Sequence, residues 1–283
     1  MKELKGKNAL VTGASRGIGV HIARALAREG VNLVLVARTV DAIEQLAREL
    51  AATGVRAVAI PADLGDLSAL DPLVGRAEAE LGPLDLLINN AGIDAVRSYQ
   101  EETDAETEHM VRIDLVSPMM LTRRVVARML ARGAGGHVVN VASLAGKTAP
   151  PYMVSYASAK AGLVNFSLAL RDELRDHGVG VSVICPGFIS DEGMFAQHAA
   201  ISGARVSPLV GTSRPEQVAA AVVRAVRDNK AEIPVNPGPV RLIQILHQFS
   251  PDTMAFVQKR LLNLNALLHT VALAEKNRGD GPN

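Results

Sequence analysis

The stretch of sequence that decides the fold is Asn8-Ala-Leu-Val-Thr-Gly13-Ala-Ser-Arg-Gly17-Ile-Gly19. Its first five residues have the apolar character of a short buried strand, and apolar residues at helical spacing follow from residue 21 to residue 29. Gly30 suits the C-terminal cap of that helix. A glycine-rich turn therefore joins a strand to the N-terminus of a helix. Such a turn lets the backbone approach a phosphate and directs free N–H groups at it.

The same alternation of strand and helix continues along the chain and predicts an α/β fold. We expect a single Rossmann-like, doubly wound parallel sheet of about seven strands with helices on both faces. Because strands buried on both faces are almost continuously apolar, the expected strands are Asn8–Thr12, Asn32–Ala37, Ala57–Pro61, Leu84–Asn89, His137–Val141, Val179–Cys185 and Ala231–Val235. The expected helices are 17–29, 41–52, 66–81, 105–131, 152–177 and 215–228.

The sequence after residue 238 is predicted to form a separate helical extension. The break N-P-G-P at 236–239 divides a dinucleotide-binding and catalytic domain, 1–238, from an extension, 239–283. Apolar residues spaced by three and four predict a short heptad seam made by Met254, Val257, Leu261, Leu264, Leu268 and Val271. Three uses remain open: packing on its own domain, contact with a second copy, or contact with a membrane surface. The last is suggested by Arg241, Lys259 and Arg260 beside apolar faces.

Composition excludes several classes of function. Of the 283 residues, 48% are hydrophobic and 21% charged, as in a globular protein with a large core. A net charge of +1, 3% aromatic residues and no Trp argue against a nucleic-acid partner. The one cysteine, Cys185, cannot form an internal disulfide, and the first residues lack an apolar signal region. We expect a cytoplasmic protein, and no spacing of His, Cys and carboxylates predicts a metal site.

Tyr156 and Lys160 are four residues apart within an expected helix, and Ser143 lies thirteen residues before the tyrosine. Residues i and i+4 share one face of a helix, about 6 Å apart along its axis, so the ammonium can lie beside the phenol. A fixed positive charge favours the phenolate and lowers the pKa of the tyrosine. Such a phenol can exchange a proton with an alcohol near neutral pH. The alternative is a chance pair on a helix surface.

Together these motifs resemble the short-chain dehydrogenase/reductase family over residues 5–237. The matching segments are T-G-x-x-x-G-x-G at 12–19, N-N-A-G at 89–92, the set Ser143, Tyr156 and Lys160, and Pro186-Gly187. The resemblance implies an oxidoreductase that transfers a hydride between a nicotinamide and a carbonyl or secondary alcohol. It also implies that Tyr156 is the general acid in reduction and the base in oxidation. Ser143 would bind the substrate oxygen, and Lys160 would lower the pKa of Tyr156 and bind the ribose.

The end of the second expected strand indicates which nicotinamide cofactor is used. Arg38 stands where a carboxylate would accept a hydrogen bond from a ribose 2′-hydroxyl, and a cation suits a 2′-phosphate instead. Arg16 adds a second guanidinium, so NADP(H) is favoured over NAD(H) unless both arginines are merely solvated. Asp63 resembles the family residue that contacts adenine. The resemblance gives the cofactor-binding residues as Gly13, Ser15, Arg16, Gly17, Ile18, Gly19, Arg38, Asp63, Leu64, Asn90, Ala91, Gly92, Tyr156, Lys160, Pro186, Gly187 and Ile189.

The chain departs from the family pattern at two positions. Asp114 occupies the place of the family's fourth catalytic residue, an asparagine, and a buried carboxylate there would need Lys160 as its partner. This pairing could alter the pH dependence of catalysis or hold Lys160 away from Tyr156. Asp191 occupies the place of a threonine after Pro186-Gly187, where an anion near the cofactor phosphates would be unfavourable. Either Ser190 substitutes for the threonine or the loop follows another path.

Two classes of function remain. The first is an NADP(H)-dependent carbonyl reductase or alcohol dehydrogenase acting on a small molecule; the second is a non-catalytic NADP(H)-binding sensor or interaction protein, suggested by Asp114 and Asp191. Residues 188–213 have the glycine content of a mobile lid, and its Met194, Phe195 and Ile201 suggest an apolar substrate unless they pack inward. The resemblance also implies a homo-oligomer, a dimer or a tetramer, built through helices 105–131 and 152–177.

Overall fold

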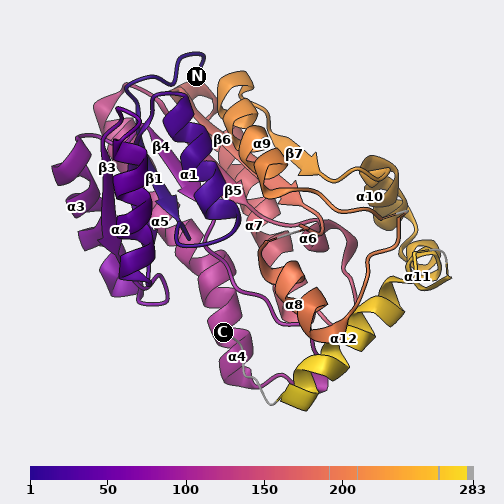
Figure 1. Cartoon of the computed structure of the whole chain (residues 1–283). Coiled ribbons are helices and arrows are strands. Elements are labelled where there is room, and N and C mark those ends of the chain that lie inside the picture. The colour runs from indigo at the N-terminus through magenta and orange to yellow at the C-terminus, as the bar shows by residue number, and fades with distance from the viewer. Residues whose placement is uncertain (191, 209, 261, 279–283) are drawn as a thin grey trace.

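A seven-stranded parallel sheet forms the centre of the protein, as the sequence predicts (Figure 1). The structure is a computed structural model and describes residues 1–190, 192–208, 210–260 and 262–278. The strands lie in the order β3-β2-β1-β4-β5-β6-β7. Their bounds are β1 Asn8–Thr12, β2 Asn32–Ala37, β3 Ala57–Pro61, β4 Leu86–Asn89, β5 Gly136–Val141, β6 Val179–Pro186 and β7 Glu232–Val235.

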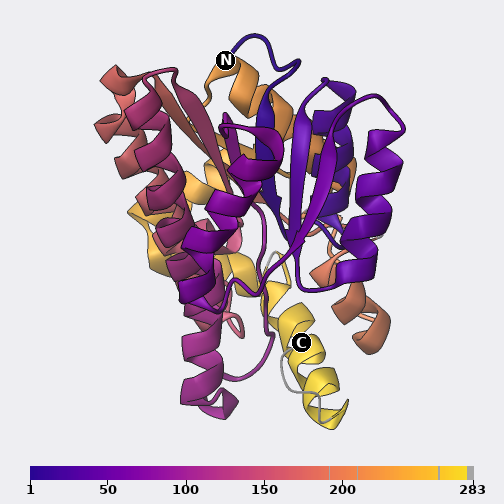
Figure 2. The same ribbon diagram turned by 90° about the vertical axis from the view of Figure 1, so that its left-hand side faces the viewer.

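Helices cover both faces of the sheet, which confirms the doubly wound fold (Figure 2). Helices α1, α2 and α9 bury residues such as Ile22, Ile43 and Val222 against one face, and α3, α5 and α7 pack on the other. The bounds are α1 Ile18–Arg28, α2 Val40–Ala51, α3 Leu70–Leu81, α4 Asp104–Val111, α5 Ser117–Arg132, α6 Ala145–Thr148, α7 Val154–Glu173, α8 Met194–Ser202, α9 Pro215–Asp228, α10 Val240–Phe249, α11 Pro251–Arg260 and α12 Leu264–Arg278.

The expected helix 105–131 is not one regular helix. Residues Arg112–Val116 form a single π-helical turn between α4 and α5. Pro118 has no N–H, so it cannot donate to the carbonyl oxygen of Asp114 four residues earlier, and the regular ladder is interrupted there. The turn leaves Asp114 completely buried beneath the sheet's carboxyl edge. π-Helical turns of this kind often occur at functional sites.

The sheet places the glycine-rich turn at the position where its winding reverses. Strand β1 pairs with β2 on one side and β4 on the other, so the connections leave in opposite directions from this point. The hydroxyl of Thr12 donates to the carbonyl of Ile88 at 3.3 Å and accepts from the amide of Asn90 at 2.9 Å. These bonds hold the ends of β1 and β4 together. Ligands of open α/β sheets bind in the crevice at such a switch point.

The C-terminal helices pack in part on the main domain. Leu264, Leu268 and Val271 of α12 are buried in the hydrophobic core on the side of the sheet that α5 covers. Met254 of α11 is also buried. The prediction of a heptad seam along one helix is nevertheless wrong, because the residues of the seam belong to two separate helices, α11 and α12. Asn263 between them has φ 52°, in the left-handed region that asparagine tolerates. Leu261 lies outside the described residues. In the described chain, no helix combines the length and apolar character that crossing a membrane requires.

Candidate functional site

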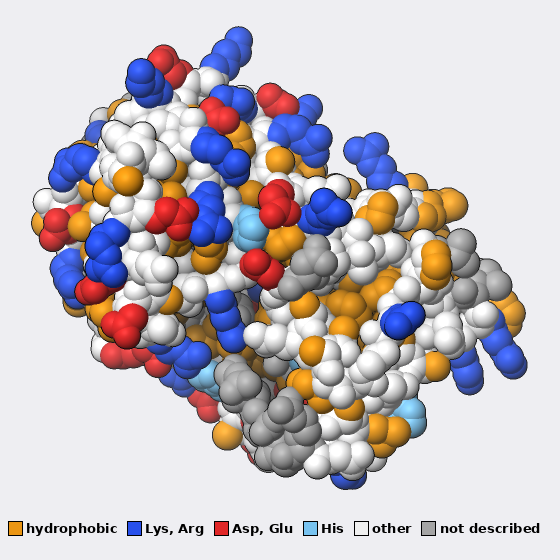
Figure 3. All heavy atoms as spheres, in the orientation of Figure 1, with side chains coloured by type: hydrophobic (Ala, Val, Ile, Leu, Met, Phe, Trp, Pro, Cys, Tyr) orange, Lys and Arg blue, Asp and Glu red, His pale blue; other side chains and the backbone are white. Residues whose placement is uncertain are grey.

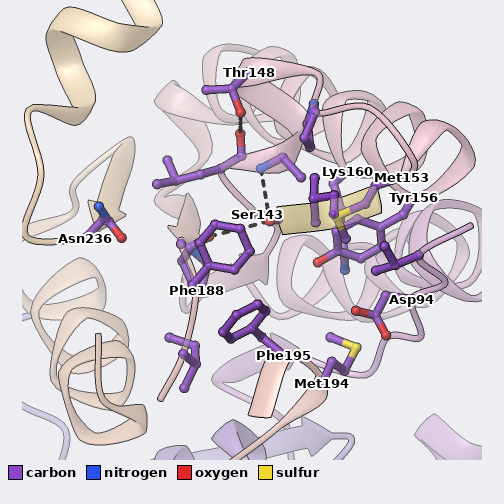
Figure 4. A pocket seen from close by; sticks show the side chains of 18 of the residues that line it. Asp94, Ser143, Thr148, Met153, Tyr156, Lys160, Phe188, Met194, Phe195 and Asn236 are labelled. Carbon is purple, nitrogen blue, oxygen red and sulfur yellow. Dashed lines mark hydrogen bonds between the residues drawn. The ribbon is translucent and has the colours of Figure 1, made fainter. Parts of the chain in front are cut away.

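A cavity lies at the carboxyl edge of the sheet and collects most of the residues that the sequence singled out. It is lined by Ser143 after β5, by Tyr156 and Lys160 of α7, and by Gly92 after β4. Figure 3 shows a hollow with hydrophobic side chains between α8, α12 and α10, and Figure 4 shows the cavity from close by. The lining extends from Ile18 at the glycine turn to the C-terminal helices. The cavity therefore joins the N-terminal motif to the extension.

Tyr156, Lys160 and Ser143 are close together, as the spacing predicts. The ammonium of Lys160 lies 5.6 Å from the centre of the Tyr156 ring and donates to the carbonyl of Val141 at 3.4 Å. The Ser143 hydroxyl accepts from the amide of Ala145 at 3.1 Å and also interacts with the phenol of Tyr156. Both α7 residues are buried. The chance pairing on a helix surface is thus excluded, because the two side chains face the cavity (Figure 4).

The pKa of Tyr156 does not follow the simple expectation. Burial of the phenol raises its pKa above the ordinary value, and the carboxylates of Asp114 and Asp94 raise it further. The interaction with Ser143 acts in the opposite direction. The net shift is therefore upward in the protein without ligands, and the expected net lowering of this pKa is not found, because desolvation and two nearby anions determine the balance. The protonated phenol is the stable form at neutral pH.

Asp114 is the partner of Lys160, as proposed for a buried carboxylate at this position. Its Oδ1 lies 3.6 Å from the Lys160 ammonium and accepts from the amide of Ile93 at 3.0 Å. Its Oδ2 is buried without a hydrogen-bond partner among the described residues. Burial raises the pKa of Asp114 to about 6, although the charge of Lys160 acts to lower it. Lys160 nevertheless stays near Tyr156, so the pairing does not remove it from the phenol.

The glycine turn has the geometry of an anion cradle. Gly13 has φ +67°, and a Cβ at this residue would come within 2.8 Å of the backbone of Ala91. Helix α1 begins at Ile18 after Gly17, and no described side chain caps its first turn. The amides of that turn are therefore available to an anionic group. The side chain of Asn90 donates to the carbonyls of Thr12 and Gly13 and fixes the turn against β4.

Arg38 and Asp63, which are expected at the adenosine end of the cofactor, come after the ends of β2 and β3. The last residues of these strands, Ala37 and Pro61, are paired in the sheet. Arg16 and Arg38 are exposed, and neither forms an ion pair with a residue that the structure describes. Two free guanidinium groups at one edge of the sheet fit a phosphate. Asp63 accepts from the amide of Gly65 at 2.9 Å, so this carboxylate also has a local role in its turn.

The segment after β6 contributes backbone to the cavity. The carbonyl of Phe188 accepts from the amide of Ser213, and the amide of Ser190 donates to the carbonyl of Ser213. Because backbone groups alternate in direction along an extended segment, the amide and carbonyl of Ile189 point away from Ser213. Pro186, Gly187 and Ile189 line the cavity. A Cβ on Gly187 would collide with the side chain of Asn236. The predicted effect of Asp191 concerns a residue outside the described part of the chain.

Sequence reasoning missed a cluster of charged side chains at the wall of the cavity, of which His198 is buried and the two carboxylates half-buried. The ring of His198 in α8 contacts Asp94 after β4, with Nε2 and Oδ2 3.0 Å apart, and its Nδ1 contacts Glu275 of α12. Burial acts to lower the pKa of His198, but the two carboxylates outweigh it and raise this pKa to about 10. The cluster ties the predicted lid to the C-terminal extension. No sequence signal could have found it, because its three residues are up to 181 positions apart.

Apolar residues of the segment after β6 line the cavity, as the sequence suggests. Phe188 and Phe195 line the cavity with their ring centres 4.5 Å apart, and Met194 lines it too (Figure 4). Ile201 is half-buried and is not among the described lining residues. Further lining comes from α10, α11, α12 and the link between the last two, none of which sequence reasoning connected with the site: Ile243, Met254, Gln258, Leu262, Leu264, Leu268 and Val271.

Comparison with known proteins agrees with this architecture. The profile of the short chain dehydrogenase family matches residues 7–202. Ketoacyl reductase HetN of Nostoc sp. is 40% identical to this chain over 261 residues, which cover 90% of this chain and 88% of HetN. A match over 90% of the chain is longer than residues 1–238, so it reaches into the C-terminal helices.

Two solved structures have the same fold. A metagenomic short-chain oxidoreductase in complex with NADP is 31% identical, with a TM-score of 0.70, and the match covers 82% of this chain and 98% of that one. A short-chain type dehydrogenase/reductase from Mycobacterium marinum is 27% identical, with a TM-score of 0.74, and the match covers 82% and 95%. With the family profile matching more than half of its length, this chain belongs to the short chain dehydrogenase family, a family of nicotinamide-dependent oxidoreductases.

Proposed function

We propose that the protein is an NADP(H)-dependent reductase of ketones that carry an apolar chain, with alcohol oxidation as the reverse reaction. The observation that carries the proposal is the position of Ser143, Tyr156 and Lys160 together in a cavity whose lining is mostly apolar. The cavity opens beside the glycine turn, so a dinucleotide held there would reach it. HetN, which aligns with 90% of the chain, is a ketoacyl reductase by name. We therefore favour a 3-oxoacyl thioester as the substrate.

Each side chain has a role that matches its surroundings. The bound nicotinamide supplies the hydride that reduces the carbonyl carbon. Ser143 donates a hydrogen bond to the carbonyl oxygen, and Tyr156 transfers its phenolic proton to that oxygen as the hydride arrives. Lys160 stabilises the resulting phenolate, because its ammonium is only 5.6 Å from the ring centre. The raised pKa of Tyr156 keeps the phenol protonated until the reaction needs the proton.

The preference for NADP(H) is proposed to depend on Arg38. Replacing Arg38 by Asp is expected to lower kcat/KM for NADPH about 100-fold, because charge-assisted hydrogen bonds to the 2′-phosphate are lost and a like charge replaces them. The activity with NADH should fall much less or rise. Steady-state kinetics with both cofactors measure the change. Arg76→Asp, at another exposed arginine on α3, is the matched control and should leave the preference unchanged; equal losses with both cofactors in Arg38→Asp would contradict the assignment.

Asp114 is proposed to set the pH dependence of the reaction. Its carboxylate raises the pKa of Tyr156, so Asp114→Asn should lower that pKa while keeping a hydrogen-bond acceptor for Ile93. Reduction requires the protonated phenol and oxidation the phenolate. The alkaline loss of reduction and the rise of alcohol oxidation should therefore both move to lower pH, by about one unit or more. Profiles of kcat/KM against pH test this, and superimposable profiles for the two proteins would contradict it.

Consumption of NADPH with a panel of 2-ketones, aldehydes and 3-oxoacyl thioesters of increasing chain length tests the proposed function. Turnover is expected, with kcat/KM rising with chain length because each added methylene is buried among apolar side chains. Tight NADPH binding without turnover across the whole panel would instead identify a sensor. Turnover limited to short polar ketones would retain the reductase and contradict the apolar substrate.

A further inference from the structure

We propose that the outward side of α10 and α11 is a docking surface for an anionic membrane. Four large apolar side chains on these two helices face solvent: Leu242 is 66% exposed, Ile245 56%, Phe249 84% and Phe256 60%. On α10 the spacing of Leu242, Ile245 and Phe249 places them on one side of the helix. Exposed apolar groups gathered in this way indicate contact with another phase or partner. We call these four residues the α10–α11 face.

Cations accompany this apolar face. Arg241, Lys259 and Arg260 are exposed, and none forms an ion pair with a residue that the structure describes. Lys259 and Arg260 lie three and four residues after Phe256, on the same side of α11. Between residues 240 and 260, the one acidic residue is Asp252. Figure 3 shows Lys and Arg side chains projecting beside hydrophobic ones at the end of the molecule where Figure 1 places α10 and α11.

Apolar groups with cations at their edge fit the boundary of an anionic bilayer. Phenylalanine and leucine side chains enter the acyl boundary, while Lys and Arg remain among anionic headgroups. Each cation near such a surface strengthens binding about fivefold. A second copy is less well matched, because a two-fold contact through this face would bring the same three cations towards each other. That alternative is testable, since Ile245 and Phe249 also border a groove against α7 that a second copy could enter.

The two helices also form part of the wall of the substrate cavity. Ile243 of α10 and Met254 and Gln258 of α11 line it, and Gln258 is fixed by donating to the carbonyl of Thr148 at 2.7 Å. The same pair of helices thus has its inner side on the cavity and its outer side on the membrane. If the proposed function holds, an apolar substrate dissolved in a bilayer lies next to the cavity. The binding of the membrane itself does not depend on that function.

Co-sedimentation of the full-length protein with lipid vesicles tests the docking surface without requiring turnover. Vesicles of phosphatidylcholine are compared with vesicles containing phosphatidylglycerol, at low and high salt. We expect binding to the anionic vesicles, at least tenfold weaker binding to the neutral ones, and weakening of the anionic binding by salt. Phe249→Ser/Phe256→Ser and Lys259→Glu/Arg260→Glu should each reduce the binding at least tenfold. Controls are Tyr99→Ser and Arg76→Glu, which change an exposed aromatic and an exposed cation elsewhere and should bind normally.

Three outcomes would overturn the proposal. The first is no binding to either kind of vesicle by the wild type. The second is binding of both double variants to the anionic vesicles as strongly as the wild type binds them. The third is a wild type that binds no vesicles but forms a dimer in analytical ultracentrifugation, when this dimer is lost in Phe249→Ser/Phe256→Ser. That result would assign the face to a second copy. Thermal unfolding and NADPH binding, measured on each variant, establish that these exposed substitutions leave the fold intact.

Discussion

Replacing Tyr156 by Phe is expected to lower kcat/KM for carbonyl reduction about 1,000-fold. The substitution removes the one phenolic proton beside the substrate position and leaves the ring in its buried place on α7. General acid catalysis by a positioned side chain contributes about 10²- to 10⁴-fold, so a loss within this range is expected. Ser143 and Lys160 remain, and the reaction should therefore be slow rather than absent. Steady-state kinetics with NADPH and a long-chain 3-oxoacyl substrate measure the effect.

The control for this variant removes a phenolic hydroxyl outside the cavity. Tyr99 is 58% exposed, and Tyr99→Phe should leave kcat/KM unchanged. The dissociation constant of NADPH should change little in Tyr156→Phe, since the loss concerns proton transfer. Undiminished turnover in Tyr156→Phe would contradict the mechanism. A parallel loss of NADPH binding would show that the tyrosine acts mainly in holding the cofactor.

The second large effect is expected for Lys160→Met, on stability as well as activity. Asp114 is 0% exposed, and the substitution leaves its carboxylate buried without the ammonium 3.6 Å away. Removing one partner of a buried ion pair costs about 3–5 kcal/mol in the free energy of unfolding. Turnover should also be lost, because the phenolate has no cation beside it. Denaturant unfolding at several pH values measures the loss of stability.

The pH dependence of this loss has a defined sign. The pKa of Asp114 is about 6 in the wild type, above its ordinary value of 3.8, and the charge of Lys160 holds it down. Without Lys160 the pKa of Asp114 in the folded protein rises further above its value in the unfolded chain. The free energy of unfolding then falls as the pH rises through the range between these two pKa values. The deficit should therefore be large at pH 8 and small near pH 5. A deficit that is independent of pH would contradict this explanation.

A double variant separates the two consequences of losing Lys160. Lys160→Met/Asp114→Asn removes the isolated charge as well and keeps a hydrogen-bond acceptor for the buried amide of Ile93. We expect the free energy of unfolding to return to within about 1 kcal/mol of the wild type. Turnover should remain lost. Recovery of turnover in the double variant would show that the ammonium is dispensable.

The fold was predictable because its signals are local. Strands β1, β2 and β3 have the predicted bounds, since each is a short apolar run; β1 and β2 are almost entirely buried, and the edge strand β3 is partly buried. The glycine turn and the pair Tyr156 and Lys160 also depend on residues that are near in sequence. Their geometry follows from helix and turn periodicity alone. Asp114 was identified as the partner of Lys160 because a buried carboxylate requires a cation.

The remaining features depend on contacts between distant segments. The cluster of Asp94, His198 and Glu275 joins three elements and has no motif. The raised pKa of Tyr156 depends on burial and on two carboxylates whose positions the spacing of α7 does not define. The break between α11 and α12 depends on Asn263 in the left-handed region, which competes with an apolar pattern that continues across it. In each case tertiary structure outweighs the local signal.

Transfer of deuterium from NADPH labelled at C4 of the nicotinamide tests the central claim most directly. The claim is that a hydride passes to a substrate carbonyl held by Ser143 and Tyr156. With a long-chain 3-oxoacyl thioester, we predict one deuterium on the carbinol carbon of the product, and about 1,000-fold slower labelling by Tyr156→Phe. Tightly bound NADPH with no labelled product, or labelling at an undiminished rate in Tyr156→Phe, would contradict the account.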